Sequence, residues 1–303
     1  MVNRTLAFGQ HFKMTDLRNG YRKGFSLTAA GTIVASFESL LVRLLPVDSW
    51  TVIFWRGLLL ALVMVVFVFV TGRKLGVGGF GRAASIAVVA YAANVSFFIS
   101  AINATTVANT LVVASAAPLF AAVIGWIILR DRPSKETSIA VVAVVVGLAI
   151  IFSGSLGMGR AAGDLMAVCY ALSLAIYFVA LQRCTNSQVP GVVALGGLLS
   201  ACLAWPLAPA LVVPSQSLGT LIALGVIVVP AATLLLSWGP QLIPASHVTL
   251  IMLLEIGFGP LWVWMSFSEV PPKPTIFGGA LVLVTIVVHS WLSARKRAEP
   301  QVA

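Results

Sequence analysis

Two opposite charges fall inside the first two long apolar stretches of this sequence, where a charged side chain is costly and often functional. Glu38 lies about 10 Å from the end of the first stretch, and Arg56 lies about 9 Å inside the second, counted from the same side. Antiparallel helices would place them at matching depth, so the sequence predicts a Glu38–Arg56 ion pair. Either a member of the pair meets a charged group of a substrate or couples an ion, or the pair only joins two helices.

A third buried charge, Glu255, lies about 14 Å into the ninth apolar stretch, near the middle of a membrane. No basic residue lies at similar depth in the second half of the chain. Such an acid is expected to be protonated, to bind a cation or to accept hydrogen bonds from buried donors. Glu255 is therefore a candidate to receive a substrate ammonium or a coupled proton. The alternative is a protonated acid that only bonds to a neighbouring helix.

Polar and aromatic side chains share one helical face in three further stretches. If these faces converge, they line a cavity that stacks an aromatic ring and hydrogen-bonds its polar end. Taken singly, each residue has a simpler interpretation, as an interfacial aromatic ring or a hydroxyl that packs helices together. The predicted substrate-binding residues are Tyr91, Asn94 and Phe98 of the third stretch, Ser173 and Tyr177 of the sixth, Thr233 and Trp238 of the eighth, and Glu255.

Motifs of intramembrane enzymes and ATP-driven pumps are missing from the sequence. It contains no HExxH, no GxxxxGK[ST], and no paired aspartates for a magnesium-bound diphosphate. Cys169, Cys184 and Cys202 form no CxxC pair. We therefore expect no catalytic residue, no metal site, no cofactor and no enzymatic activity.

Composition identifies the elements that must position these residues. Apolar residues make up 59% of the 303 residues, charged residues 9%, and the mean hydropathy is +1.03. A soluble domain is about 45–50% apolar and about 25% charged, so this chain is an all-α integral membrane protein. Apolar runs long enough to cross a membrane lie at 25–45, 50–71, 83–102, 107–129, 138–153, 163–183, 190–212, 218–238, 246–267 and 276–293, which predicts ten transmembrane helices.

The basic residues predict the orientation of these spans. An even number of spans puts both termini on one face, which receives 15 of the 19 Lys and Arg residues. Arg43, Arg160 and Lys273 fall on the other face, and Arg56 lies within a span. Because positive charge marks the cytoplasmic side, both termini are expected to be cytoplasmic in a multi-pass protein of the cell inner membrane. The net charge of +10 is distributed in short clusters between spans, so we expect no nucleic-acid partner.

The two halves of the chain resemble each other at an offset of about 138 residues, which aligns Asp131 with Glu269 and Pro133 with Pro271. Each half holds five spans, an odd number, so the second half must enter the membrane upside down. The fold is therefore predicted to be two inverted five-helix repeats, an arrangement typical of secondary transporters. The predicted divisions are a cytoplasmic N-terminal tail 1–24, a first repeat 25–153, a second repeat 163–293 and a cytoplasmic tail 294–303.

The fourth span has small residues at 114–117, followed by Pro118, Phe120 and Trp126, and it is followed by Asp131. In this pattern it resembles the EamA family of the drug/metabolite transporter superfamily. The second copy keeps a glutamate, Glu255, but places Ile256 where proline is usual. In length and layout the chain is similar to aromatic amino-acid exporters of the YddG type.

The resemblance implies a secondary transporter that exports amino acids, preferably aromatic or neutral ones, and related small metabolites by alternating access. The alternatives are a multidrug or other metabolite carrier of the same fold and, from other classes, a channel or an intramembrane enzyme. The expected partners are a small-molecule substrate and the lipid bilayer, and the chain is expected to work as a monomer.

Overall fold

The protein is a bundle of helices, seen here in a computed structural model that describes residues 2–72, 75–76, 79–129, 134–185, 187–243 and 245–298. These residues form helices and connecting segments without a strand. Ten helical stretches are long and apolar enough to cross a membrane, so the predicted number of spans is confirmed. The spans are Gly20–Leu44, Ser49–Thr71, Arg82–Ala104, Val107–Trp126, Lys135–Leu156, Ala161–Leu181, Val189–Leu207, Ser215–Trp238, Leu250–Phe267 and Lys273–Leu292.

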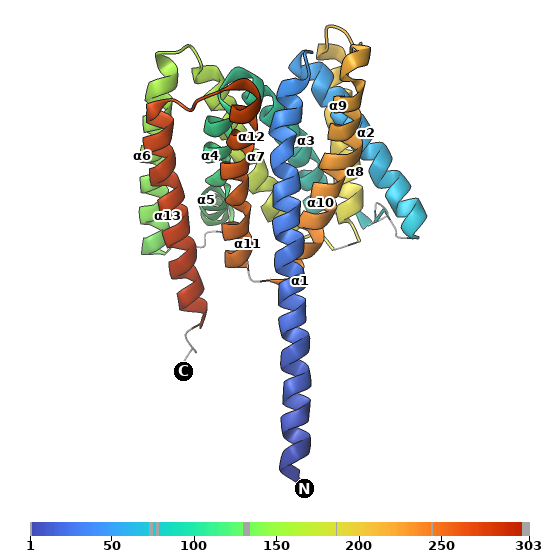
Figure 1. The fold of residues 1–303 in the computed structure, drawn as a ribbon, viewed down its shortest axis with the longest axis vertical. Helices are drawn as coiled ribbons and strands as arrows, with labels where there is room; N and C mark the ends of the chain where they lie inside the picture. Colours follow the sequence, from blue (N-terminus) through green and yellow to red (C-terminus); the bar gives the residue numbers. More distant parts are fainter. Residues whose placement is uncertain are drawn as a thin grey trace.

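Several spans are built from more than one helical segment. The α-helices are α1 (Val2–Leu44), α2 (Ser49–Thr71), α3 (Arg82–Ala104), α4 (Val107–Ser115), α5 (Ala117–Leu129), α6 (Lys135–Leu156), α7 (Ala161–Leu181), α8 (Val189–Ala204), α9 (Leu218–Ile222), α10 (Val229–Trp238), α11 (Ala245–Met252), α12 (Leu254–Phe267) and α13 (Lys273–Ala298). Both ends of the chain lie at the same end of the bundle, and α1 extends beyond the other helices there (Figure 1). We call this the termini end and the opposite one the loop end.

Short polar side chains cap the starts of several spans. Asp48 begins α2 by accepting hydrogen bonds from the backbone N–H groups of Trp50 and Thr51 at 2.9 and 3.0 Å. Thr106 begins α4 in the same way, by accepting from the N–H of Asn109 at 3.1 Å. These caps satisfy N–H groups that a helix leaves without a partner at its start, so the chain turns sharply between spans.

The contacts between helices have the symmetry expected of two related halves. The first span (α1) packs against the eighth (α10) and the ninth (α12), and the sixth (α7) packs against the third (α3) and the fourth (α4 and α5). Exchanging each span for the one five places away converts the first set of contacts into the second. The contacts of the second span with the seventh, and of the fifth with the tenth, map onto themselves. The predicted boundaries of the repeats stay a prediction, but this pairing supports them.

Small residues allow the closest of these contacts. Gly57 of α2 and Gly197 of α8 cross with their backbones touching, and a Cβ atom on Gly197 would lie 2.8 Å from the Gly57 carbonyl oxygen. A Cβ atom on Gly57 would overlap the Gly197 carbonyl oxygen and the Ser200 hydroxyl. Small side chains at helix crossings are a usual means of bringing membrane helices together.

The fourth and ninth spans are both interrupted, at positions that correspond in the predicted repeat. The fourth breaks at Ala116, between α4 and α5, and the ninth at Leu253, between α11 and α12. Pro118 explains the first break, because it has no N–H for the carbonyl one turn earlier. No proline accompanies the second break, although Gly257 and Gly259 weaken the helix that follows.

Other details of the predicted spans differ from the structure. The seventh span is predicted to reach residue 212 and to include Pro206 and Pro209, but α8 ends at Ala204 and only a short 3₁₀ turn, Trp205–Leu207, follows. The prolines therefore end this helix, which agrees with their missing N–H groups. The fifth span is a full helix rather than a short one, and the eighth contains a π-helical segment, Ala223–Val228.

Candidate functional site

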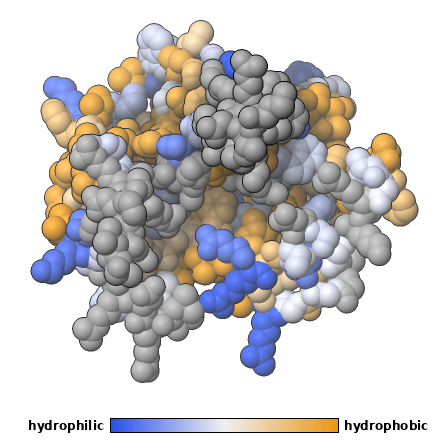
Figure 2. Space-filling model, turned by 90° about the horizontal axis from the view of Figure 1, so that it is seen from below, coloured by the Kyte–Doolittle hydropathy of each residue, from blue (hydrophilic) through white to orange (hydrophobic). Residues whose placement is uncertain are grey.

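A cavity lies where the two interrupted spans face the sixth span. It has a volume of about 90 Å³ and opens between α4, α5, α7, α11 and α12. Viewed from the termini end, the surface is hollowed near its middle, and the atoms visible in the hollow are mostly apolar (Figure 2). The cavity is lined by Leu111, Ala114, Ser115, Ala117, Pro118, Tyr170, Leu174, Phe178, Met252, Leu253, Glu255 and Ile256.

Glu255 is the one acidic residue among those lining residues. It lies in the first turn of α12, directly after the break at Leu253. The carboxyl group faces a cavity whose other lining residues are uncharged, and a cationic ligand there would supply a matching charge.

The structure brings Glu38 and Arg56 together. Arg56 Nη2 lies 2.6 Å from Glu38 Oε1, and Arg56 Nε donates to the same oxygen at 2.7 Å. Both side chains are largely buried, with exposed fractions of 7% for Arg56 and 13% for Glu38. The pair joins α1 to α2, and whether it also contacts a substrate stays a prediction.

The predicted aromatic faces of the third and sixth spans meet. The Tyr91 ring lies 5.4 Å from the Tyr177 ring in an edge-to-face arrangement, and the Phe98 ring lies 5.0 Å from that of Tyr170. Edge-to-face and tilted aromatic pairs of this separation are favourable. The aromatic rings therefore hold α3 against α7, and one of them, Tyr170, also lines the cavity.

Tyr170 connects the cavity to the ion pair. It lies within electrostatic range of Glu255 and also of Glu38, Arg56 and Tyr91. The Tyr91 hydroxyl is within reach of Arg56. Residues from the first, second, third, sixth and ninth spans thus form one polar and aromatic cluster, which the sequence had left as separate faces.

The remaining predicted residues are placed as follows. Asn94 has a buried Nδ2 without a hydrogen-bond partner. Ser173 donates to the Tyr170 carbonyl oxygen of its own helix at 2.9 Å, which satisfies it locally. Thr233 interacts with the Tyr91 hydroxyl. Trp238 lies against Phe67, with ring centroids 6.1 Å apart, near the termini end of α10, and does not line the cavity.

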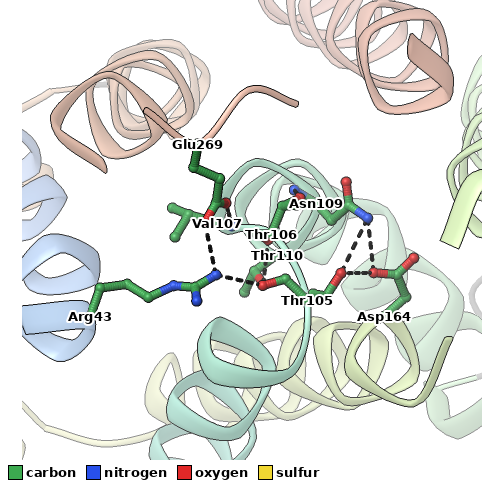
Figure 3. A network of polar contacts seen from close by, with 8 residues as sticks. All are labelled: Arg43, Thr105, Thr106, Val107, Asn109, Thr110, Asp164 and Glu269. Carbon is green, nitrogen blue, oxygen red and sulfur yellow. Dashed lines mark hydrogen bonds and ion pairs between the residues drawn. The ribbon is translucent and has the colours of Figure 1, made fainter. Parts of the chain in front are cut away.

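Sequence analysis missed a polar network at the loop end (Figure 3). Arg43 Nη2 lies 3.0 Å from Glu269 Oε2 and also donates to the Thr105 carbonyl oxygen at 2.8 Å. Glu269 Oε1 accepts the N–H of Val107, the first residue of α4, at 3.0 Å. The cation thus lies at the C-terminus of α3 and the anion at the N-terminus of α4, which suits both helix dipoles.

Behind this pair, a fully buried carboxylate completes the network. Asp164 Oδ1 accepts from Thr105 Oγ1 at 2.5 Å and from Asn109 Nδ2 at 2.9 Å, as Figure 3 shows. Asn109 also donates to Ser155 Oγ at 3.1 Å and accepts from Thr275 Oγ1 at 2.5 Å. These bonds join the fourth, fifth, sixth and tenth spans and the C-cap of α3 around one amide. In the sequence, Asp164 looks unremarkable because it lies near the end of a span.

The first and ninth spans are further held together below the network. Trp262 donates its Nε1–H to Ser36 Oγ at 2.9 Å, and its ring stacks on Phe37 with centroids 4.7 Å apart. The loop end is therefore closed between α1 and α12, whereas the cavity lies toward the termini end. Within the described part of the chain, no three His, Cys, Asp or Glu side chains are grouped as metal ligands.

Comparison with known proteins gives three likenesses. Residues 22–153 match the model of the EamA-like transporter family. The uncharacterized transporter YwfM of Bacillus subtilis (strain 168) is 27% identical over 212 residues, which are 68% of this chain and 72% of that protein. A crystal structure superimposes with a TM-score of 0.63 at 16% identity, over 89% of this chain and 97% of the other, a likeness that shows the fold alone.

Proposed function

Residues 22–153 are similar to the EamA-like transporter family, and from that premise we propose that the whole chain is a secondary carrier that moves amino acids and related small metabolites by alternating access. Aromatic and other neutral amino acids are the preferred substrates in this proposal. The carrier is a multi-pass membrane protein whose small-molecule substrate binds within the bilayer.

One observation carries the proposal: two spans are broken at corresponding positions, and the breaks meet at a cavity that holds a carboxylate. Carriers built from inverted repeats bind substrates near the membrane midplane, between interrupted helices whose free backbone groups face the ligand. Glu255 supports an ammonium group as one part of the substrate, and the rings of Tyr170 and Phe178 support an aromatic side chain as another.

The direction and location of transport follow from orientation. We place both termini in the cytoplasm and the chain in the inner membrane, because the basic residues gather on the termini side. The cavity then opens toward the cytoplasm and the network of Arg43 and Glu269 closes the outer side. This is the state in which an exporter loads its substrate. The carrier is proposed to act as a monomer, because both halves of the chain supply residues to the cavity described above.

Counterflow in proteoliposomes tests the proposal. Vesicles loaded with unlabelled phenylalanine should transiently accumulate labelled phenylalanine above its equilibrium level, and empty vesicles should not. The same experiment with threonine and with a lipophilic cation measures selectivity. Flux without an overshoot for every substrate would contradict a carrier and indicate a channel.

A multidrug or other metabolite carrier is the second candidate. It is supported by the apolar side chains of Leu111, Leu174 and Met252 in the cavity lining, which can adapt to ligands of different shapes. An overshoot with the lipophilic cation but not with phenylalanine would favour this candidate over the amino-acid carrier.

A further inference from the structure

Two buried hydrogen-bond donors of the second and third spans, Arg56 Nη1 and Asn94 Nδ2, have no acceptor among the residues that the structure describes. Arg56 directs Nε and Nη2 at Glu38, but its Nη1 has no partner, although the residue is only 6% exposed. Asn94 Nδ2 is also buried without a partner. Leaving a buried donor unpaired costs roughly 1–3 kcal/mol, and more for a charged group, so such donors usually await a ligand or water.

The two donors belong to one neighbourhood. The Tyr91 hydroxyl is within reach of the Arg56 guanidinium, and Asn94 follows Tyr91 by three residues on the same face of α3. A guanidinium and an amide N–H that lack acceptors form the chemistry of a carboxylate or phosphate site. Because Glu38 uses the other edge of the guanidinium, an anionic group can bind Nη1 without breaking the ion pair.

Tyr170 links this neighbourhood to Glu255. Its ring contacts that of Phe98, one turn after Asn94 on α3, at 5.0 Å, and it lines the same cavity as Glu255. Donors without acceptors therefore lie on the second and third spans, and an acceptor that faces the cavity lies on the ninth span.

We propose that Arg56 Nη1 and Asn94 Nδ2 form a subsite for a carboxylate, and that the carried substrate is a zwitterion whose ammonium group binds Glu255. This inference rests on the proposed function and narrows it. A carrier for amines alone needs Glu255 and has no use for the two free donors, whereas an α-amino acid uses both the donors and Glu255 at once.

Competition binding on the purified full-length chain tests the subsite with three related ligands. These are phenylalanine, phenethylamine, which lacks the carboxylate, and 3-phenylpropionate, which lacks the ammonium group. Asn94→Ala should weaken phenylalanine binding about tenfold, as expected for a lost hydrogen bond to a charged group. Phenethylamine binding should change less than twofold. Asn94→Asp should weaken phenylalanine further, because it places a like charge beside the carboxylate.

Asn103→Ala is the matched control, since Asn103 lies on the same helix but bonds to Ser49 Oγ at the loop end, at 2.9 Å; it should leave all three affinities unchanged. Asn94 is preferred to Arg56 for the test because removing the arginine strands a buried Glu38. An equal shift for phenylalanine and phenethylamine, or no shift for either, overturns the subsite. If counterflow of phenylalanine persists in that case, the carrier function stands without it. Absence of both binding and counterflow for phenylalanine overturns both.

Discussion

At the residue scale, the two acids Glu38 and Glu255 have different surroundings and therefore different expected roles. Glu38 is matched by Arg56 at 2.6 Å, so its charge is compensated inside the protein. Glu255 faces a cavity whose other lining residues are uncharged. Among these two acids, only Glu255 has its charge left for a ligand to match, which places the recognition of a positive group there.

Replacing Glu255 with glutamine tests this assignment. The variant keeps the size of the side chain but removes its charge, so the substrate ammonium loses a charge-assisted hydrogen bond. Initial counterflow of phenylalanine at low concentration should fall about tenfold or more. Glu136→Gln, at the start of α6 and away from the cavity, is the control, and equal rates for the two variants would contradict the role of Glu255.

Separate and joint replacement of Glu38 and Arg56 tests whether their main contribution is to stability. Arg56→Met leaves a buried carboxylate without its partner and should reduce stability by about 3–5 kcal/mol. Glu38→Gln combined with Arg56→Met should recover most of that loss, because neither charge is then stranded. Melting temperatures in detergent measure the cycle. If the double variant lost as much stability as the two single variants together, the two residues would not act as a pair.

Sequence reasoning reached Glu38, Arg56 and Glu255 because a charge inside an apolar run is visible from composition alone. It did not reach Asn109 or Asp164, whose importance depends on Thr105 and on groups from distant spans that meet them. Asn and Asp near the ends of spans look like ordinary solvated residues until the fold buries them. A spatial relation of this kind leaves no local signal in one sequence.

At the element scale, the spans differ in whether they cross a neighbour closely or are interrupted. The second and seventh spans cross tightly at Gly57 and Gly197, whereas the fourth and ninth are interrupted beside the cavity. A tight backbone crossing suits a fixed part of the bundle. Interrupted helices expose backbone groups to a ligand and can bend at the break.

Gly57→Ala tests the tight crossing. The added methyl group would overlap the Gly197 carbonyl oxygen and the Ser200 hydroxyl, so α2 and α8 must separate. We expect a loss of about 1–3 kcal/mol in stability, the usual cost of overpacking. Gly125→Ala in α5 is the matched control, because nothing lies within 4 Å of its added carbon; it should be neutral or slightly stabilising. A similar loss in both variants would contradict this account of the crossing.

The closure of the loop end is tested by Glu269→Gln. The substitution removes the ion pair with Arg43 that holds the ninth span near the first and third, an interaction of about 1 kcal/mol at its partly exposed position. The open state should become about fivefold more populated. Its measure is labelling of Ala108→Cys, 7% exposed in α4, by a maleimide added at the loop end. Unchanged labelling, with Lys273→Gln as control, would mean that the pair does not hold this end closed.

The number of spans depends on hydrophobicity alone and was predicted from the sequence. The breaks and ends of individual helices depend on local backbone geometry and were not. Ten apolar runs predicted ten spans, because a membrane-spanning helix must satisfy its own backbone and present apolar side chains to lipid. The break at Leu253 could not be read from the sequence, since it lacks the proline that marks Ala116. The end of the seventh span was predicted too late because the apolar run continues beyond Pro206, whereas the helix ends at Ala204.

At the scale of the whole molecule, the structure is a bundle closed at one end and hollowed at the other. The closed end is held by Arg43, Glu269 and the buried network around Asn109, and the hollow lies between the interrupted spans and the sixth span. Reversing the two ends requires α1 to part from α12 while α7 closes on the fourth span. Because the contacts of these spans are symmetric, the two arrangements would use equivalent sets of helix contacts.

The most direct test of the central claim, that substrate passes through this cavity, is a single cysteine at Leu174. Cys169, Cys184 and Cys202 are first replaced by serine; burial raises the pKa of the Cys184 thiol, which slows but does not prevent its labelling. In vesicles that expose the termini end, a membrane-impermeant maleimide should label Leu174→Cys and abolish phenylalanine counterflow. Phenylalanine present during labelling should slow the reaction. Full labelling that leaves counterflow intact would place the transport route elsewhere and contradict the account.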